Sequence, residues 1–319
     1  MKQPLILFLT TLCLACGCDK GEPCVFCTDP PVPRRLQLTL LNTAPNTKGS
    51  DALQALESQI SQCVLYVFSR GGHLVNCYQS SDGRFDFFLT DETYDFVAVA
   101  NKASLPLFGI GKNDIYRTET TLAENGEGGF VMVGRLDNHL IEADEKITVE
   151  MQRLVAKVSY EIHTAFSGPL AGASFQVDDI YLTNVVGGNN LALTDSLPTA
   201  QALWYNRMDR EVCADMPLAL LQGGPVFYAY PNASPDSHDK TQWGSRCTRF
   251  VVKATLAGRT TYYPVTLTHV QANHHYHVDL TIANYGVDHP EDLPQDYNGF
   301  QARLHVVPWT SGTSLQGNF

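Results

Sequence analysis

A change of hydrophobic phase near the middle of the chain constrains its fold more than any other feature. Residues 147–151 place apolar side chains at odd positions, whereas residues 154–162 place them mainly at even positions. Alternation with a period of two is typical of strands that bury one face. Because a slip of one residue turns every side chain to the opposite face, the phase change at Gln152 and Arg153 predicts that one strand leaves a sheet and the next enters another. We expect two β domains that meet at this point.

The length and charge of the chain limit its class. With 319 residues the chain can form two hydrophobic cores, since single cores tend to stop growing before that length. A composition of 44% hydrophobic and 17% charged residues is that of a globular protein. The net charge of -11 and the pI near 5.3 argue against nucleic acid as a partner, because its binding needs a basic surface.

The N-terminus has the features of an export signal. Lys2 precedes an apolar run over residues 5–9, and small residues follow up to Cys18. This run is too short to span a bilayer as a mature helix. Its end on cysteine resembles a bacterial lipoprotein signal, in which the cysteine is lipidated, and Cys18 and Cys16 are the two candidates. Neither has the usual leucine three residues before it, and a plain secretory signal is the alternative. We expect a signal peptide over residues 1–18.

The cysteine count bears on the choice between these two positions. Lipidation at Cys18 would leave an even number of cysteines in the mature chain, whereas lipidation at Cys16 would leave an odd number. An even set suits an oxidising compartment. The remaining six are Cys24, Cys27, Cys63, Cys77, Cys213 and Cys247.

Three disulfides can be drawn from these six residues. Cys24 and Cys27 have the spacing of a redox or metal half-site, but no second pair of this kind occurs, so a local disulfide fits better. Cys63 and Cys77 flank a glycine turn almost symmetrically, which allows a cross-strand bridge. Cys213 would close a long loop with Cys247.

Short strands separated by turns account for most of the chain. Residues 19–35 are rich in proline, lack periodicity and predict a tether. The strands expected in an N-terminal domain over residues 36–153 are 36–41, 63–68, 73–78, 85–89, 94–101, 130–133 and 147–151. Those expected in a C-terminal domain over residues 154–319 are 154–162, 173–186, 226–232, 250–256, 261–267, 276–282 and 302–307. This pattern predicts an all-β chain with two β-sandwich domains in tandem.

Histidines form the one local group that could bind a metal. They are His269, His274, His275 and His277. His275 and His277 would share one face of a strand, but Asp279 is the one supporting carboxylate. We expect a polar strand face and no metal site.

The sequence offers no catalytic motif. It lacks a Gly-x-Ser-x-Gly elbow and a glycine-rich loop that would hold phosphate, and its carboxylates are scattered in turns. We therefore expect no enzyme activity and no cofactor.

Several stretches of the chain carry a resemblance when they are taken together. They are residues 66–68 with the following glycine turn, 94–101, 151–158, 262–265, 273–282 and 306–309. Their order and spacing resemble, over nearly the whole mature chain, the fimbrillin family of Bacteroidales, the lipoprotein-derived pilins and accessory proteins of type V pili. Residues 195–197 also resemble the O-glycosylation acceptor of secreted proteins from the same bacteria.

The resemblance implies a fold, a location and a mode of assembly. Members have two transthyretin-like β-sandwich domains and reach the outer membrane as lipoproteins, which places them on the cell surface and in the fimbrium. Stalk subunits lose their first strand to an arginine-specific protease, and the vacated groove takes a strand from another fimbrial subunit. A donated strand satisfies the exposed backbone and covers the apolar trough, so this assembly needs no catalytic residue. Adhesion to a host glycan or protein is the role that such pili would serve.

Two arginines near the N-terminus bear on this processing. Arg34 and Arg35 precede the expected strand 36–41, so a cut there would remove the tether and leave the strand. The following loop offers Lys48 and no arginine. The sequence thus favours an anchor, accessory or tip subunit over a stalk subunit.

Both ends of the mature chain hold candidates for strand exchange. Their apolar residues are Leu36, Leu38 and Leu40 in the first strand and Leu304 and Val306 in the last. Residues 302–319 would form either a donor strand or a closing strand with a polar tail.

A second function class stays open from the sequence. A surface lipoprotein that binds or processes glycans would present aromatic side chains on a shallow platform, for which Trp204, Tyr205 and Trp243 are available. A purely structural lipoprotein is the third option.

Overall fold

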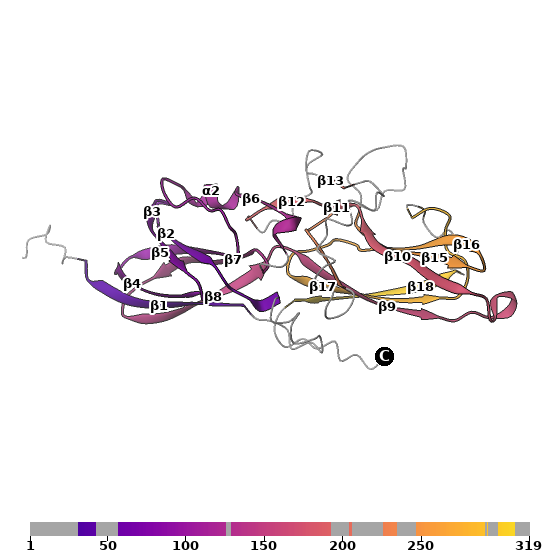
Figure 1. Cartoon of the computed structure of the whole chain (residues 1–319). Coiled ribbons are helices and arrows are strands. Elements are labelled where there is room, and N and C mark those ends of the chain that lie inside the picture. The colour runs from indigo at the N-terminus through magenta and orange to yellow at the C-terminus, as the bar shows by residue number, and fades with distance from the viewer. Residues whose placement is uncertain are drawn as a thin grey trace, which may run out of the picture.

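The computed structural model describes residues 31–42, 57–125, 129–192, 204–205, 226–234, 247–290, 292 and 299–309. Two β-rich halves lie end to end in an elongated molecule (Figure 1). Helix in the described residues is limited to α2 (Lys112–Tyr116), residues 57–58, and two short 3-10 turns, η1 (Leu122–Glu124) and η2 (Gly168–Leu170). The predicted all-β class is confirmed. None of the described helices has the length and hydrophobicity that crossing a membrane would need.

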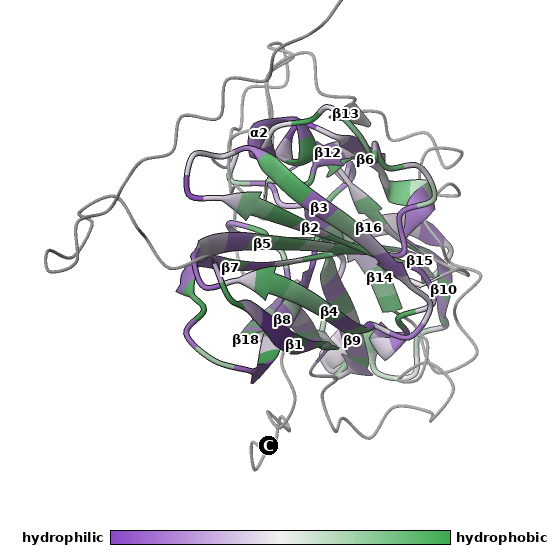
Figure 2. Ribbon diagram, turned by 90° about the vertical axis from the view of Figure 1, so that its left-hand side faces the viewer, coloured by the Kyte–Doolittle hydropathy of each residue, from purple (hydrophilic) through white to green (hydrophobic). Residues whose placement is uncertain are grey.

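The first half is built on a seven-stranded sheet. Its strands are β1 (Pro33–Leu41), β2 (Cys63–Ser69), β3 (Leu74–Ser80), β4 (Arg84–Thr90), β5 (Thr93–Ala100), β7 (Met132–Leu140) and β8 (Glu145–Arg153). They lie in the order β3-β2-β5-β7-β8-β1-β4. Inward side chains of β1, β4 and β8 meet those of β2 and β5 in one hydrophobic core. Figure 2 looks along the molecule at this half and shows bands of hydrophobic and hydrophilic residues along its strands.

The second half consists mainly of two further sheets. The first has the order β14-β9-β17-β18, and the second has the order β10-β15-β16. The strands of the first are β9 (Ala156–Thr164), β14 (Val226–Ala229), β17 (His274–Ile282) and β18 (Phe300–Pro308). Those of the second are β10 (Phe175–Thr183), β15 (Arg249–Leu256) and β16 (Arg259–Thr266). Aromatic rings join the two sheets, with Phe250 against Tyr160 and Phe227, and Tyr263 against Phe300.

The change of hydrophobic phase coincides with a change of sheet. Ile147, Val149 and Met151 of β8 are buried in the core of the first half. β9 begins at Ala156 and pairs with β14 and β17 of the second half. β8 includes residues 152 and 153 and ends there, so the strands before and after Leu154 and Val155 belong to different sheets, as the change of alternation predicts.

The two halves share hydrophobic packing. β2 and β5 are buried on both faces, and their second face packs into a cluster that continues into the second half. Backbone pairing also joins the halves, because β6 (Glu119–Thr121) pairs with β12 (Gly188–Asn190). Within the second half, β11 (Val185–Val186) pairs with β13 (Trp204–Tyr205). Because one core crosses the boundary, the division into domains at residues 153 and 154 stays a prediction.

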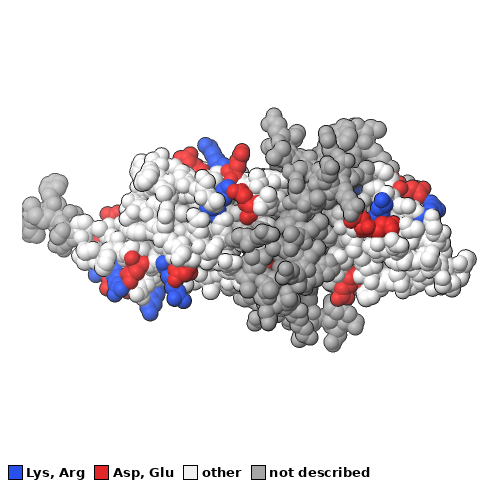
Figure 3. Space-filling view, in the orientation of Figure 1, with Lys and Arg blue, Asp and Glu red and all other residues white. Residues whose placement is uncertain are grey.

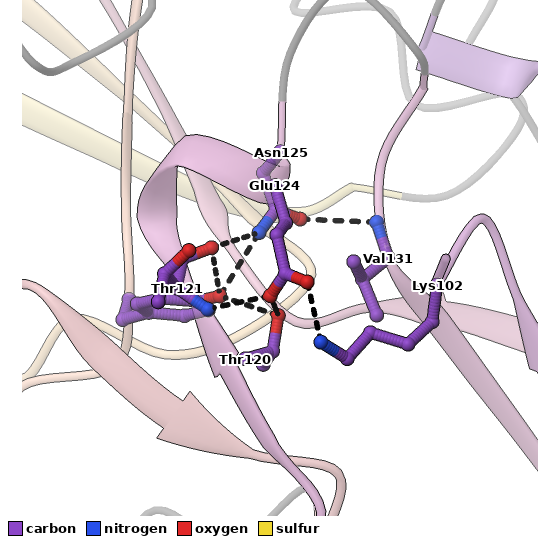
Figure 4. A network of polar contacts seen from close by, with 7 residues as sticks. Lys102, Thr120, Thr121, Glu124, Asn125 and Val131 are labelled. Atoms are coloured by element: carbon purple, nitrogen blue, oxygen red, sulfur yellow. Dashed lines mark hydrogen bonds and ion pairs between the residues drawn. The ribbon is translucent and has the colours of Figure 1, made fainter. Parts of the chain in front are cut away.

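Polar contacts fix the segment that carries β6 and η1 (Figure 4). The Glu124 carboxylate accepts hydrogen bonds from Lys102 Nζ, from the Thr120 hydroxyl at 2.8 Å and from the Thr121 backbone N–H at 2.8 Å. Burial alone would raise the pKa of Glu124, but these donors lower it. Asn125 extends the network to the second half, since its side-chain amide donates to the Tyr230 hydroxyl at 2.9 Å. The network holds β6 where it can pair with β12.

Candidate strand-exchange interface

The first strand occupies an interior position in its sheet. β1 pairs antiparallel with β4 along residues 33–39 and parallel with β8 along residues 36–41. A central strand is held by backbone hydrogen bonds on both sides, so its removal would leave two open edges. This is the arrangement that strand exchange requires.

The inward face of β1 forms part of the hydrophobic core. Leu36, Leu38 and Leu40 are almost completely buried, and they are three of the predicted exchange residues. They lie between inward side chains of β4 and of β8: Phe85, Phe87 and Leu89 on one side, and Ile147 and Val149 on the other. Burial of each leucine contributes roughly 1.5–3 kcal/mol. Without β1, the site would be an apolar trough between two unpaired strand edges.

The predicted position of the two arginines relative to the first strand is wrong. β1 begins at Pro33, before the expected start at Leu36, so Arg34 and Arg35 lie within the strand. They pair with Leu89 and Phe88 of β4. Proline has no backbone N–H to donate to a neighbouring strand. At the first residue of a strand this hydrogen bond is not needed, which is why Pro33 does not prevent β1 from pairing.

Side-chain and backbone contacts also hold Arg35. Its guanidinium makes a two-pronged contact with Asp86, with Nε–Oδ1 at 3.0 Å and Nη2–Oδ2 at 2.5 Å, and its backbone N–H donates to Asp144 Oδ1 at 2.8 Å. The hydrogen bond from Arg35 is the main cause that lowers the pKa of Asp86. Basic and acidic side chains mix along the lower side of this half in Figure 3, where β1 and β8 lie in Figure 1. A protease would have to pull Arg35 out of a paired strand before cutting beside it.

The last described strand lies at a sheet edge. Within the described residues β18 follows β17 at the end of the four-stranded sheet, and the two pair from His274↔Pro308 to Ile282↔Phe300. Leu304 packs against the core, whereas Val306 is 44% exposed. The structure thus brings Leu304 and Val306 to an edge in the second half, away from the groove of β1 in the first.

Comparison with known proteins connects this arrangement to a family. The family model described as "Mfa2: Fimbrillin-A associated anchor proteins Mfa1 and Mfa2" matches residues 29–205, more than half of the chain. The chain belongs to this Mfa2 family. The predicted membership of the Bacteroidales fimbrillin group is confirmed, and the chain is a fimbrial protein of the cell surface.

Solved structures share the fold of this Mfa2-family chain. A fimbrilin (fimA) from Porphyromonas gingivalis W83 superposes with a TM-score of 0.66 at 16% identity, covering 87% of this chain and 98% of that one. The tip fimbrial protein Mfa3 from Porphyromonas gingivalis, with a C-terminal truncation, gives 0.57 at 14% identity, covering 87% and 100%. A search among curated proteins finds no match. At these identities the likeness concerns the fold alone.

Two histidines of the Mfa2-family chain share one face of β17 as predicted, but His275 is buried there. His275 and His277 project from the same side of β17, and both contact the Ser159 hydroxyl, at 2.7 Å and 2.8 Å. Burial, then Lys157 and His277, lower the pKa of His275 to about 3. Within the part of the chain that the structure describes, no three histidine, cysteine, aspartate or glutamate side chains come together as a metal site.

The cross-strand bridge between Cys63 and Cys77 that the turn would allow does not form in the structure. Both are free cysteines, because Cys63 pairs with Ser80 while Cys77 pairs with Tyr66. Cys63 and Tyr66 are three residues apart on β2, so the two thiols lie on opposite faces of the pair. Burial raises the pKa of both thiols, which makes them less reactive at neutral pH.

Several predicted sites lie outside the described residues, and they remain predictions. These are Cys16, Cys18, Cys24, Cys27, Lys48, residues 195–197, Cys213 and Trp243. Trp204 and Tyr205 are described only as the backbone of β13, so the aromatic platform of the glycan hypothesis is untested.

Two residues that lie where the two halves meet were not predicted as sites. In the sequence, Arg153 marked only the change of hydrophobic phase, and Trp309 only the end of a stretch that resembles the fimbrillin family. Both are almost completely buried. A buried arginine cannot be recognised from its place in an alternating pattern unless its partners are known.

Proposed function

We propose that this chain is an anchor or accessory subunit of a type V pilus, that it retains β1, and that it joins other subunits by backbone strand pairing. The observation that carries this proposal is the position of Arg34 and Arg35 inside β1: both pair with β4, and the strand after them, residues 36–41, pairs with β8 as well. A cut at either residue would leave 36–41 in the groove. A stalk subunit needs that groove vacated, whereas an anchor does not.

The proposed role is non-enzymatic. Pairing of strand edges forms hydrogen bonds and buries apolar surface, and it makes or breaks no covalent bond. The proposed partners are other fimbrial subunits and the outer membrane, the latter through a lipid on Cys18 or Cys16. Two sandwich domains, 36–153 and 154–319, would present the strand edges, and a host glycan or protein would be met by the assembled pilus.

The lipid anchor can be tested in the producing bacterium. A strain carrying Cys16→Ala together with Cys18→Ala should lose cell-attached pili and release more pilus material into the medium, because both candidate lipidation sites are removed. The measurement is immunoblotting of cell and medium fractions with electron microscopy of the cells. The Cys77→Ala variant is the matched control, since it removes a half-buried free thiol away from the signal. Unchanged cell-attached pili in the double variant would contradict an anchoring role.

A further inference from the structure

Three charged side chains are buried together where the two halves meet. Arg153 ends β8, Lys157 lies in β9, and Glu57 precedes β2, after the connection from β1. Lys157 Nζ lies 2.7 Å from Glu57 Oε1. Arg153 Nε donates to the Glu57 backbone carbonyl at 2.9 Å. The Tyr228 hydroxyl also donates to Glu57 Oε1, at 2.8 Å.

Trp309 joins this cluster from the end of β18. Its backbone N–H donates to the Asn273 carbonyl at 2.7 Å, and its own carbonyl accepts from Arg153 Nη1 at 3.2 Å. The Arg153 guanidinium carbon lies 4.4 Å from the centre of the indole, a distance at which cation–π attraction operates. Tyr228 stacks on the same indole at 5.8 Å, and Phe130 meets it edge to face. Arg153 thus contacts Trp309 at the end of β18 and also Glu57, whose backbone carbonyl accepts a further hydrogen bond from the Asn42 side chain, directly after β1, at 3.3 Å.

The cluster is costly to bury. It combines two cations with one anion, and Glu57 Oε2, Arg153 Nη2 and Trp309 Nε1 are buried without a hydrogen-bond partner. Burial lowers the pKa of Arg153 to about 10, although Glu57 opposes the shift. Apolar residues of similar volume often stabilise a core as well as a buried ion cluster does, so stability alone is a weak reason for charges here. A role in fixing one arrangement of the chain accounts for them better.

The junction clasp is the set of four buried residues Arg153, Glu57, Lys157 and Trp309. We propose that the junction clasp couples the two terminal strands, so that loosening β1 in its groove also loosens the end of β18. The clasp holds the end of β18 in its sheet while β1 stays in its groove, so a partner strand that pairs at either strand acts on the other. This inference rests on the proposed strand-pairing function and adds a link between the groove of β1 and the sheet edge at β18.

Amide hydrogen exchange on the full chain tests the hold on β18. In the Arg153→Met variant the amides of Val307 and Trp309, which face β17, should exchange roughly tenfold faster, as expected when one charge-assisted hydrogen bond is lost. Amides in β2 and β5 should change much less. The matched control is Arg259→Met, which removes an exposed guanidinium 5.1 Å from the Tyr285 ring and an ion pair with Asp288. Should Arg153→Met not fold, Arg153→Lys keeps the charge but not the fork-shaped contact, and should show the same local effect.

A double-variant comparison tests the coupling, which a merely structural role would not produce. Leu38→Ala weakens the packing of β1 in its groove and should speed hydrogen exchange of the Trp309 amide. Val67→Ala removes buried surface of β2 from the same core and leaves every side chain of β1 intact, so it should speed that exchange much less. Combined with Arg153→Met, Leu38→Ala should add little further effect at Trp309. Equal effects of Leu38→Ala and Val67→Ala, or unchanged exchange in Arg153→Met, would overturn the inference. Pilus assembly is not part of this readout, so failure here is distinct from failure of the proposed function.

Discussion

His275 lies buried in the middle of a sheet beside other basic groups. Lys157 is its register partner on β9, His277 projects from the same side of β17, and Ser159 lies within hydrogen-bond distance of both rings. Burial also lowers the pKa of His277, and His305 adds to that shift while Glu161 opposes it. The alternation of apolar and polar residues over 275–282 predicts that these histidines point away from the apolar face of the strand. Their burial could not be predicted, because it depends on side chains of β9 and β18.

Stability should fall in acid because of His275. An unfolded histidine has a pKa near 6.5, whereas the folded value is about 3, so between these values the unfolded chain binds the extra proton. The free energy of unfolding should fall by up to about 1.4 kcal/mol per pH unit on going below pH ~6.5. Urea unfolding across this range should show a shallower slope for His275→Gln than for the unchanged chain. The exposed His163→Gln serves as the control, and identical slopes for all three would refute this contribution.

Strand β1 shows at the level of one element what the sequence can predict. Its buried side is evident from Leu36, Leu38 and Leu40, because one face meets a core. Its start at Pro33 and its place between β4 and β8 are not evident, since they depend on pairing with distant residues. The short strands β6 and β12 were not predicted for a related reason. They are polar and are held by backbone pairing, so their sequences show no alternation of apolar and polar residues.

Alanine substitutions on the two faces of β1 should have different effects on the free energy of unfolding. Leu38→Ala should lower the free energy of unfolding by about 2–5 kcal/mol, because it removes a buried side chain from a packed core. Thr39→Ala, one residue on and exposed, should change it by less than about 0.5 kcal/mol. Equilibrium urea unfolding measures both. Similar losses in the two variants would mean that β1 does not pack as described.

At the scale of the whole molecule, the two halves form one connected body. Phe130 of the first half packs against Tyr228 and Trp309 of the second, and Arg153 bridges between them. The phase change predicts where the chain passes from one sheet to the next. It does not predict the shared core, which forms because β2 and β5 bury both faces. Exchange of a strand in one half would therefore act on a structure packed against the other.

The N-terminus of the chain recovered from pili tests the central claim most directly. Pili would be purified from the producing bacterium, and intact mass and N-terminal sequencing would be applied to this chain and its co-purifying subunits. If it retains β1 as an anchor or accessory subunit, it should co-purify with pilins and carry a blocked, acylated N-terminus at Cys18 or Cys16. A free N-terminus beyond Leu41 would contradict this account, because β1 would then be lost and the chain would be processed as a stalk subunit.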